Sequence, residues 1–334
     1  MTVNIGVIGT GSIGSDHIRR IGEKCRGGRV VAVSDLDQER AAAIAARVDA
    51  KAFPSGAELI ANAEVDAVLV ASLAPTHAEY VLGCLAAGKP VFSEKPLATT
   101  AADCERVVAA EQAAGRRLVQ VGFMRRFDSD YRQLKAALDG GEIGDPLMIH
   151  CVHRNPFAVE SYHSEMATTD TAIHEIDAIR WLLDEELTSV QVLTPRKTSR
   201  RHAHLQDPQI MLYASDSGVR ADVEVFVNCQ YGYDIQCEAV GETGTARLPD
   251  PARLSVRSQA RETRAVPQTW QERFTTAFDV EIQEWIDAVA EDRTSGPSAW
   301  DGYAAAVIAD ATVKALHSGG IESIPMPARP GFYD

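Results

Sequence analysis

Residues 3–14 join an apolar run to a glycine-rich turn, and this feature constrains the fold more than any other part of the chain. The run VNIGVIG leads directly into Gly9-Thr10-Gly11-Ser12-Ile13-Gly14, which has the G-x-G-x-x-G spacing. The missing side chains permit a tight turn, a close approach of the backbone to a pyrophosphate, and close packing of a helix on a strand. The motif alone is weak, but its place between a strand and a helix predicts a dinucleotide-binding turn.

The rest of residues 1–122 alternates short apolar runs with alanine-rich stretches. Runs rich in Val and Ile begin at residues 29, 65, 89 and 117. The intervening segments have helix-forming composition and end near glycine, so each can cross back over one face of a parallel sheet. We therefore expect an N-terminal Rossmann domain, with a doubly wound parallel sheet, over residues 1–122.

The run at residue 29 ends in Asp35, which bears on the choice of cofactor. Its position matches the ~20-residue separation expected for the acid that binds an adenosine ribose. A carboxylate accepts hydrogen bonds from both ribose hydroxyls but would lie against the charge of a 2′-phosphate, so Asp35 favours NAD over NADP. The alternative is that Asp35 caps the loop before the next helix, with Asp37 sharing the work, and both roles could hold at once.

Two further segments are expected at the carboxyl edge of the sheet, where open α/β domains bind ligands. One holds Ala74-Pro75-Thr76-His77 and the other holds Glu94-Lys95-Pro96. A lysine at a strand end is usually a solvated surface charge, but the following proline stiffens the backbone that carries Lys95. His77 is expected to be a loop or cofactor-adjacent histidine rather than a catalyst. The predicted cofactor-binding residues are Gly9, Gly11, Ser12, Ile13, Gly14, Asp35, Ser72, Pro75, His77, Glu94 and Lys95.

After residue 122 the pattern changes and predicts a C-terminal α+β domain over residues 123–334. Runs that begin at residues 147, 190, 208, 219, 234 and 245 have short connections and indicate a large, mostly antiparallel open sheet. Helical stretches follow near 280–292 and 298–316, and these could pack back on the first domain. A sheet face left uncovered by helices would expose apolar surface, so we expect a homo-oligomer.

Residues 168–183 carry the most chemistry in this domain, and their periodicity is helical. Asp170, His174 and Asp177 share one helical face. A threonine near the start is the expected N-cap, which places Asp170 in the first turn. An Asp one turn from a His can orient the imidazole and stabilise its protonated form, as a base that deprotonates an alcohol requires. The alternative is a surface Asp-His pair on an exposed face. The apolar stripe on another face consists of Ile173, Ile176, Ile179 and Leu183.

Charge and cysteine content exclude several classes of partner. With 47 acidic against 33 basic residues, the net charge of -14 disfavours nucleic acid and anionic membranes. No apolar run reaches the ~18 residues of a spanning helix and no basic leader precedes the first strand, so we expect neither export nor membrane insertion. Six cysteines without a Cys-x-x-Cys pair are typical of reduced thiols in a cytoplasmic protein. Metal-ligand spacing is also missing, so we predict no metal and a small-molecule partner.

Seven segments together resemble a known family: GTGSIG, SEKPLATT, QVGFMRRFD, HRNP, TDTAIHEIDAIRWLL, YGYDIQCE and SGPSAWDGYAA. They are similar to the Gfo/Idh/MocA oxidoreductases along nearly the whole chain. The Glu-Lys-Pro turn points to this superfamily, and the helix motif with HRNP and YGYDIQCE points to its inositol branch. The resemblance implies an NAD-dependent dehydrogenase that oxidises myo-inositol to 2-keto-myo-inositol (scyllo-inosose) in inositol breakdown, and a homotetramer assembled through the C-terminal sheets.

The resemblance also implies roles for individual residues. Lys95, Asp170 and His174 would form the catalytic set: His174 takes the hydroxyl proton, Asp170 orients His174, and Lys95 hydrogen-bonds the reacting oxygen. A surface role remains the alternative for Asn155 and Asp177. The implied polyol-binding residues are Lys95, Met124, Arg125, His153, Asn155, Asp170, Thr171, His174, Asp177 and Tyr233.

The substrate's stereochemistry stays open. Residues 156–167 and 196–206 match the family least well, and the first stretch lies between His153 and Asp170. Because other members act on scyllo-inositol, chiro-inositol, glucose or amino-cyclitols, a dehydrogenase of another cyclitol or sugar is the first alternative. A non-catalytic nucleotide-binding sensor is the second, and the joint presence of Lys95, Asp170 and His174 argues against it.

Overall fold

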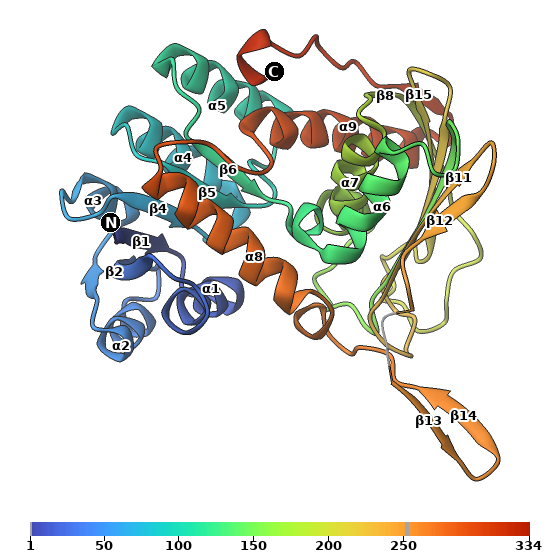
Figure 1. The fold of residues 1–334 in the computed structure, drawn as a ribbon, viewed down its shortest axis with the longest axis horizontal. Helices are drawn as coiled ribbons and strands as arrows, with labels where there is room; N and C mark the ends of the chain where they lie inside the picture. The colour runs from blue at the N-terminus through green and yellow to red at the C-terminus, as the bar shows by residue number, and fades with distance from the viewer. Residues whose placement is uncertain (1, 251–253) are drawn as a thin grey trace. The chain divides into compact units, whose positions relative to one another are not determined.

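The computed structural model describes residues 2–250 and 254–334, which fall into two compact units, each with its own sheet (Figure 1). The first unit comprises Met1–Met124, Phe278–Ala306 and Ala328–Asp334, and the second comprises Arg125–Ala277 and Val307–Pro327. Within the described part of the chain, no helix is both long and apolar enough to cross a lipid bilayer.

The first unit is built on six parallel strands in the order β3-β2-β1-β4-β5-β6. This is the doubly wound order of a dinucleotide-binding sheet, and its direction reverses between β1 and β4, where such sheets bind ligands. The central strands are buried on both faces, which explains why they were visible as continuous apolar runs. The strands are β1 (Val3–Ile8), β2 (Gly28–Ser34), β3 (Lys51–Phe53), β4 (Ala67–Val70), β5 (Val91–Glu94) and β6 (Val119–Gly122).

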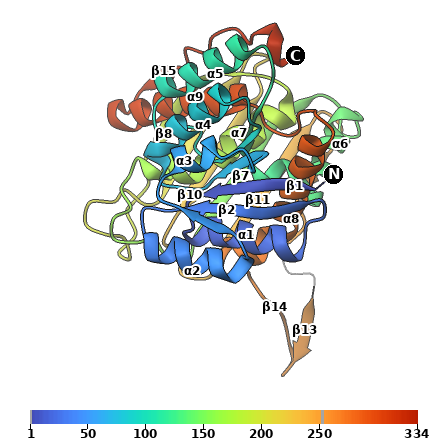
Figure 2. The same cartoon turned by 90° about the vertical axis from the view of Figure 1, so that its left-hand side faces the viewer.

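Helices cover both faces of this sheet, with α1 and α2 on one face and α4 and α5 on the other (Figure 2). Local signals set their ends. The Asp37 side chain accepts from the backbone N–H of Arg40 at the start of α2, and Thr100 caps α5 by accepting from the N–H of Asp103. The helices are α1 (Ser12–Glu23), α2 (Gln38–Val48), α3 (Gly56–Ala61), α4 (His77–Ala86) and α5 (Ala101–Ala114), with a 3-10 turn η1 (Ala74–Thr76) before α4.

A late helix, α8 (Trp270–Ala290), completes the core of the first unit. Its Ile282, Trp285 and Ile286 pack in one buried cluster with Ile18 and Ile21 of α1 and with the apolar side chains of β1 and β2. The hydrophobic face of α1 is therefore covered by a segment more than 250 residues away in sequence, which no local pattern specifies.

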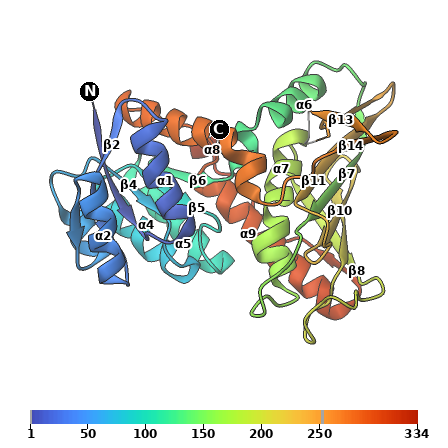
Figure 3. The same ribbon diagram turned by 90° about the horizontal axis from the view of Figure 1, so that it is seen from below.

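The second unit holds a seven-stranded sheet in the order β12-β11-β7-β10-β9-β8-β15. Only β7 and β10 pair in parallel, so the predicted, mostly antiparallel sheet is confirmed. Figure 3 shows α7 along one face of this sheet. The strands are β7 (Pro146–Arg154), β8 (Leu187–Leu193), β9 (Gln209–Ser215), β10 (Arg220–Phe226), β11 (Asp234–Gly241), β12 (Thr245–Arg247) and β15 (Ile321–Ser323). The remaining helical segments are η2 (Met124–Phe127), α6 (Ser129–Asp139), the π-helix η3 (Ala167–Ala172), α7 (Ile173–Leu183), α9 (Ala299–Ser318) and η4 (Gly331–Tyr333).

Four short strands escaped the sequence analysis. They are β3, β15 and the two strands of a hairpin that extends from the second unit, β13 (Ser255–Ser258) and β14 (Arg261–Arg264) (Figure 1). Each has only three or four residues and most of those residues are exposed or half-buried, so an alternation of apolar and polar side chains cannot develop.

Candidate active site

The glycine-rich turn of the first unit has the geometry that a dinucleotide requires. Gly9 has φ +93°, and a Cβ there would lie 2.4 Å from the carbonyl oxygen of Ala71. A Cβ at Gly14 would lie 2.0 Å from the carbonyl oxygen of Gly9, whereas a Cβ at Gly11 would meet nothing within 4 Å. The first glycine therefore serves the turn and the third serves the contact of helix and strand, while the second leaves open space where a phosphate can approach the backbone.

Asp35 follows β2 and is tied to this turn. Its Oδ2 accepts from the backbone N–H of Thr10 at 2.6 Å and from the Thr10 hydroxyl at 2.8 Å. Its Oδ1 accepts from the N–H of Asp37 at 2.9 Å and from Nη2 of Arg40 at 2.6 Å. Burial alone would raise the pKa of the Asp35 carboxyl, but these hydrogen bonds outweigh it and hold the pKa below its usual range.

The loop-capping alternative is therefore true in part. Asp37 is the N-cap of α2, while Asp35 binds the N–H of Asp37 and links that loop to the glycine turn. The four hydrogen bonds use the four acceptor positions of the Asp35 carboxylate. A ribose hydroxyl would replace one of these partners, and the half-exposed Arg40 side chain is the one most easily displaced.

His77 joins the two segments that follow β4 and β5. Its ring nitrogens lie 2.7 Å from the carbonyl oxygen of Pro96 and 3.0 Å from that of Ser72, and the residue is buried. The Ser72 hydroxyl is hydrogen-bonded to that of Thr76 at 2.7 Å. His77 is the first residue of α4 rather than a loop residue, and its contact with Pro96 fixes the backbone directly after Lys95. That it lies beside the cofactor stays a prediction.

The second unit presents its polar residues from one helix that begins irregularly. Residues 167–172 form a π-helix before α7, and such wide turns are frequent at functional sites. Asp170 lies in its first turn, as expected, but the predicted threonine N-cap is wrong: the residue before the helix is Met166, and its side chain makes no capping hydrogen bond. The threonines at 168 and 169 lie inside the widened turn instead.

His174 is only 8% exposed, so the alternative of an exposed surface pair is wrong for the histidine, although Asp170 is exposed. The neighbouring Thr171 hydroxyl is hydrogen-bonded to that of Tyr162 at 2.6 Å. Burial raises the pKa of Tyr162, and the nearby charge of Asp170 adds to that shift. Tyr162 lies in the stretch that matches the family least well, and the structure places it against the predicted site.

The Asp177 carboxylate is fully buried, and an arginine binds it with two hydrogen bonds. Arg126 donates from Nε to Oδ2 at 2.9 Å and from Nη2 to Oδ1 at 2.5 Å. This is the two-pronged geometry that guanidinium and carboxylate groups favour. The surface alternative for Asp177 is therefore wrong, and Arg126 is a partner that the sequence analysis missed.

A second buried charge pair lies behind His153 of β7. Arg125 forms an ion pair with Glu175, and Nδ1 of His153 lies 3.0 Å from Oε1 of Glu175 and 3.1 Å from Nη2 of Arg125. Burial alone would raise the pKa of Glu175, but the charge of Arg125, followed by that of His153, outweighs it and lowers the pKa to about 2. Glu175 was not predicted, although a carboxylate inside the motif His174-Glu175-Ile176-Asp177 was a usable signal.

The ring of His153 lies close to two other rings of this unit. His153 lies 6.5 Å from His174 and 5.6 Å from Tyr233, measured between ring centroids, and Tyr233 meets His153 edge-on. Asn155 is half-buried, and its backbone N–H and carbonyl bind Phe226 and Cys229. Within the second unit, the predicted residues Thr171, His174, Asp177, His153 and Tyr233 are all buried near α7 and β7.

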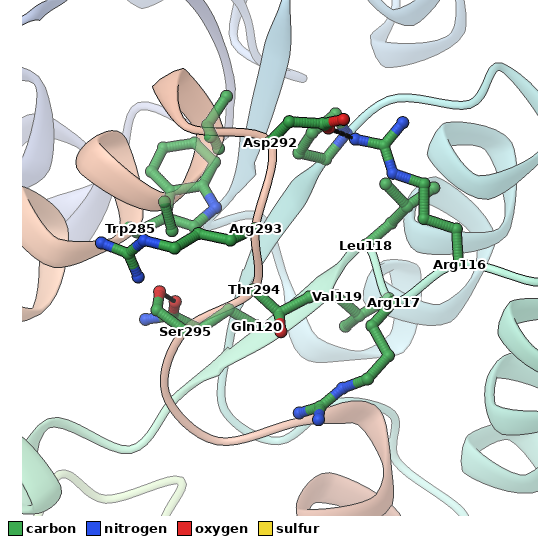
Figure 4. Close-up of a pocket in the computed structure, with 13 residues that line it drawn as sticks. Arg116, Arg117, Leu118, Val119, Gln120, Trp285, Asp292, Arg293, Thr294 and Ser295 are labelled. Atoms are coloured by element: carbon green, nitrogen blue, oxygen red, sulfur yellow. Dashed lines mark hydrogen bonds and ion pairs between the residues drawn. The ribbon is translucent and has the colours of Figure 1, made fainter. Parts of the chain in front are cut away.

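A separate cavity of about 310 Å³ lies in the first unit at the amino ends of β5 and β6, the opposite edge from the glycine turn (Figure 4). Three arginines line it, but their guanidinium groups point in different directions. Arg116 is ion-paired with Asp292, and Arg117 lies over the ring of Tyr333 at 5.7 Å. These cations do not converge on one position, and the cavity is not part of the candidate active site.

Comparison with known proteins identifies the family. Residues 3–123 match the model of an oxidoreductase family with an NAD-binding Rossmann fold, and residues 135–325 match the C-terminal alpha/beta domain of the same family. The chain belongs to the Gfo/Idh/MocA oxidoreductase family. The predicted fold class, the oxidoreductase activity and the NAD cofactor are thereby confirmed.

Relatives in this family match along the whole chain. Inositol 2-dehydrogenase 3 of Saccharopolyspora erythraea is 60% identical over 333 residues, which cover 100% of this chain and 98% of the relative. Inositol 2-dehydrogenase of Pseudomonas fluorescens strain Pf-5 is 56% identical, with 100% of both chains covered. The crystal structure of myo-inositol dehydrogenase from Lactobacillus casei in complex with NAD(H) and myo-inositol has a TM-score of 0.98 and 42% identity, with 100% of both chains covered. Scyllo-inositol dehydrogenase from the same organism has a TM-score of 0.91 and 26% identity, with 98% of this chain and 100% of that chain covered.

Proposed function

We propose that this protein oxidises myo-inositol to 2-keto-myo-inositol with NAD as the hydride acceptor, as a step of inositol breakdown. One observation carries the proposal: the chain matches, over its full length, a myo-inositol dehydrogenase whose structure holds NAD(H) and myo-inositol. The fit of the residues supports it, because Gly11 leaves space at the turn and Asp35 stands at the end of β2.

In the proposed reaction the protein disposes of a proton and stabilises oxygen charge. NAD, held by residues 9–14 and Asp35, would supply the hydride acceptor. His174 takes the hydroxyl proton and Asp170 orients its imidazole. Lys95 hydrogen-bonds the same oxygen and stabilises its alkoxide character. The remaining proposed cofactor contacts are Ser12, Ile13, Ser72, Pro75, His77 and Glu94.

Recognition of the polyol is assigned to groups that pair with several hydroxyls. When the wrong stereoisomer binds, a polar group of the protein loses its hydroxyl partner and stays buried without a hydrogen bond. The free-energy cost of that unpaired group lets the site discriminate strongly between stereoisomers. The proposed polyol-binding residues are Lys95, Met124, Arg125, His153, Asn155, Asp170, Thr171, His174, Asp177 and Tyr233. We further propose the functional boundaries 1–122 for NAD binding and 123–334 for polyol binding and assembly.

Scyllo-inositol is the second candidate substrate. It is favoured by the likeness to the scyllo-inositol dehydrogenase structure, but that relative is 26% identical whereas the myo-inositol enzyme is 42% identical. The two inositols differ in the orientation of one hydroxyl, so the choice depends on how the pocket pairs that single group.

The test measures formation of NADH from NAD, or of NADPH from NADP, by the purified protein with myo-, scyllo- and chiro-inositol, glucose and xylose. We expect turnover with NAD and myo-inositol, reduced about a hundredfold or more in His174→Ala. His317→Ala is the matched control, because His317 lies in the same unit on α9, is exposed, and belongs neither to the proposed site nor to the proposed assembly face. Turnover of only another polyol would refute myo-inositol as the substrate but not the proposed mechanism. NAD binding without any turnover would favour the alternative of a non-catalytic nucleotide-binding sensor.

We also propose a cytoplasmic homotetramer that assembles through the second unit's sheet. Large apolar side chains remain exposed along that sheet, among them Met148 on β7, Leu193 on β8 and Leu212 on β9. Neighbouring strands bring such residues together, and exposed apolar area of this kind marks association surfaces. A second copy of the chain would bury them.

A further inference from the structure

The mechanism above leaves one buried histidine unused, in the helix that follows the glycine turn. His17 of α1 is fully buried, and its ring lies between Phe92 and Phe278, 5.8 Å from each and edge-on to both. Burying a polar ring against two aromatic rings costs free energy unless its nitrogens are hydrogen-bonded. Both ring nitrogens of His17 have hydrogen-bond partners, and the identity of each partner determines whether that nitrogen donates or accepts.

Arg20 determines which ring nitrogen of His17 carries the hydrogen. Its Nη1 lies 3.0 Å from Nδ1 of His17, and a guanidinium group can only donate. Nδ1 therefore accepts, which assigns the ring hydrogen to Nε2. Arg20 is itself fixed, because its Nε donates to Asp279 at 2.6 Å and its Nη2 donates to Asp16 at 2.8 Å.

The Nε2 hydrogen is donated to Glu94, the residue directly before Lys95. Nε2 of His17 lies 2.7 Å from Oε1 of Glu94, and the other carboxylate oxygen accepts the backbone N–H of Lys95 at 3.2 Å. Gly122 on the adjacent strand makes room for this carboxylate, because a Cβ there would lie 3.2 Å from Oε2 of Glu94. The Glu94 side chain is 9% exposed and turned toward α1.

We propose that His17 is a positioning residue for Lys95. Arg20, His17 and Glu94 form a directed chain of hydrogen bonds that ends on the Lys95 backbone, and it holds the Glu94 carboxylate toward α1. The backbone after Lys95 is fixed independently, because His77 binds the carbonyl of Pro96. The root of the lysine is thus held on both sides, which limits where its ammonium group can point. The inference rests on the proposed catalytic role of Lys95.

The test compares two substitutions at the same buried position. His17→Phe keeps an aromatic ring between Phe92 and Phe278 but loses both hydrogen bonds. His17→Gln keeps one donor for Glu94 and one acceptor for Arg20. We expect His17→Phe to lower kcat by about tenfold to a hundredfold but to raise the Kd for NAD by less than about fivefold, because Glu94 is only one of the proposed cofactor contacts whereas a displaced Lys95 slows the chemistry itself. His17→Gln should recover most of kcat.

Two controls separate positioning from simple loss of stability. Ile18→Ala removes buried methyl groups from the same helix without touching Glu94, so it should lower Tm and leave kcat unchanged. In a Lys95→Met background, His17→Phe should cause no further loss of kcat, because its effect passes through the lysine. Normal turnover in Lys95→Met alone would refute the role of Lys95 in the proposed function.

The inference itself fails on different results. Wild-type kcat in His17→Phe overturns it, as does an equal loss of kcat in Ile18→Ala at a matched loss of Tm. A His17→Gln variant no better than His17→Phe overturns it too, and so does a further loss of kcat when His17→Phe is added to an impaired Lys95→Met.

Discussion

Glu175 and Arg125 form a fully buried ion pair behind His153, and Glu175→Gln tests what that pair contributes. The substitution leaves the Arg125 charge buried without its anionic partner, which typically costs about 3–5 kcal/mol. We therefore expect the free energy of unfolding to fall by that amount at pH 7. The exposed Glu142 provides the matched control, and Glu142→Gln should change stability by less than about 0.5 kcal/mol.

The pH dependence gives the sharper test. The pKa of Glu175 falls from 4.5 to about 2 on folding, so its ionised form favours the folded state. The stabilisation is complete above pH 4.5 and is lost as the pH falls toward 2, with a total of about 3 kcal/mol. From proton linkage, the folded state has lost about 1 kcal/mol of this stabilisation at pH 4 and about 2 kcal/mol at pH 3.

Wild type should lose stability over this range while Glu175→Gln lacks this contribution, so the gap between them should narrow by about 2 kcal/mol from pH 7 to pH 3. Urea denaturation followed by circular dichroism at pH 7, 4 and 3 measures the gap, with Glu142→Gln run in parallel. A gap that stays constant across these pH values would refute the assignment of the shift to the Arg125 ion pair.

Three further predictions concern the cofactor turn, cofactor choice and assembly. Gly14→Ala places a Cβ 2.0 Å from the Gly9 carbonyl oxygen and should lower Tm by several degrees. A Cβ in Gly11→Ala meets nothing within 4 Å, so this variant should keep its Tm but bind NAD with a higher Kd. Thermal unfolding scans measure the first effect, and fluorescence titration with NAD measures the second. Asp35→Ser removes the carboxylate that repels a 2′-phosphate and releases Arg40 to bind that phosphate. The ratio of kcat/KM for NADP to kcat/KM for NAD should therefore rise about tenfold or more. An unchanged ratio would contradict the role of Asp35 in selecting NAD. Leu212→Glu puts a charge on the exposed sheet face, and light scattering should show the mass falling toward that of one chain, 36.1 kDa; an intact tetramer would exclude that face.

Sequence reasoning succeeded where the signal is local. The glycine turn could be predicted because its G-x-G-x-x-G spacing lies within one short segment, residues 9–14, and includes a backbone conformation that favours glycine, as at Gly9 with its positive φ. The parallel strands could be predicted because burial on both faces requires continuous apolar runs. The same reasoning missed β13 and β14, which bury too little to leave a pattern.

For the candidate site too, residues close together in the sequence could be predicted and partners far apart in the sequence could not. Asp170 and His174 were visible because they are four residues apart on one helix, although the π-helix that carries Asp170 left no sign in the periodicity. The resemblance to a family, rather than any spacing, supplied Lys95 as a catalyst. The bonds of Arg126 to Asp177 and of Arg125 to Glu175 join residues about 50 positions apart, so neither pair could be predicted from a short window.

The sequence by itself determined the two kinds of sheet, the dinucleotide turn and the family, because short-range sterics and the pattern of apolar residues encode them. Only the tertiary structure decided how the buried charges are paired. His17 and Glu94 are 77 positions apart, and a hydrogen bond of 2.7 Å between them exists only once α1 has packed beside β5. The physical reason is that a buried polar group must find its partner in space, and the fold rather than the local sequence supplies that partner.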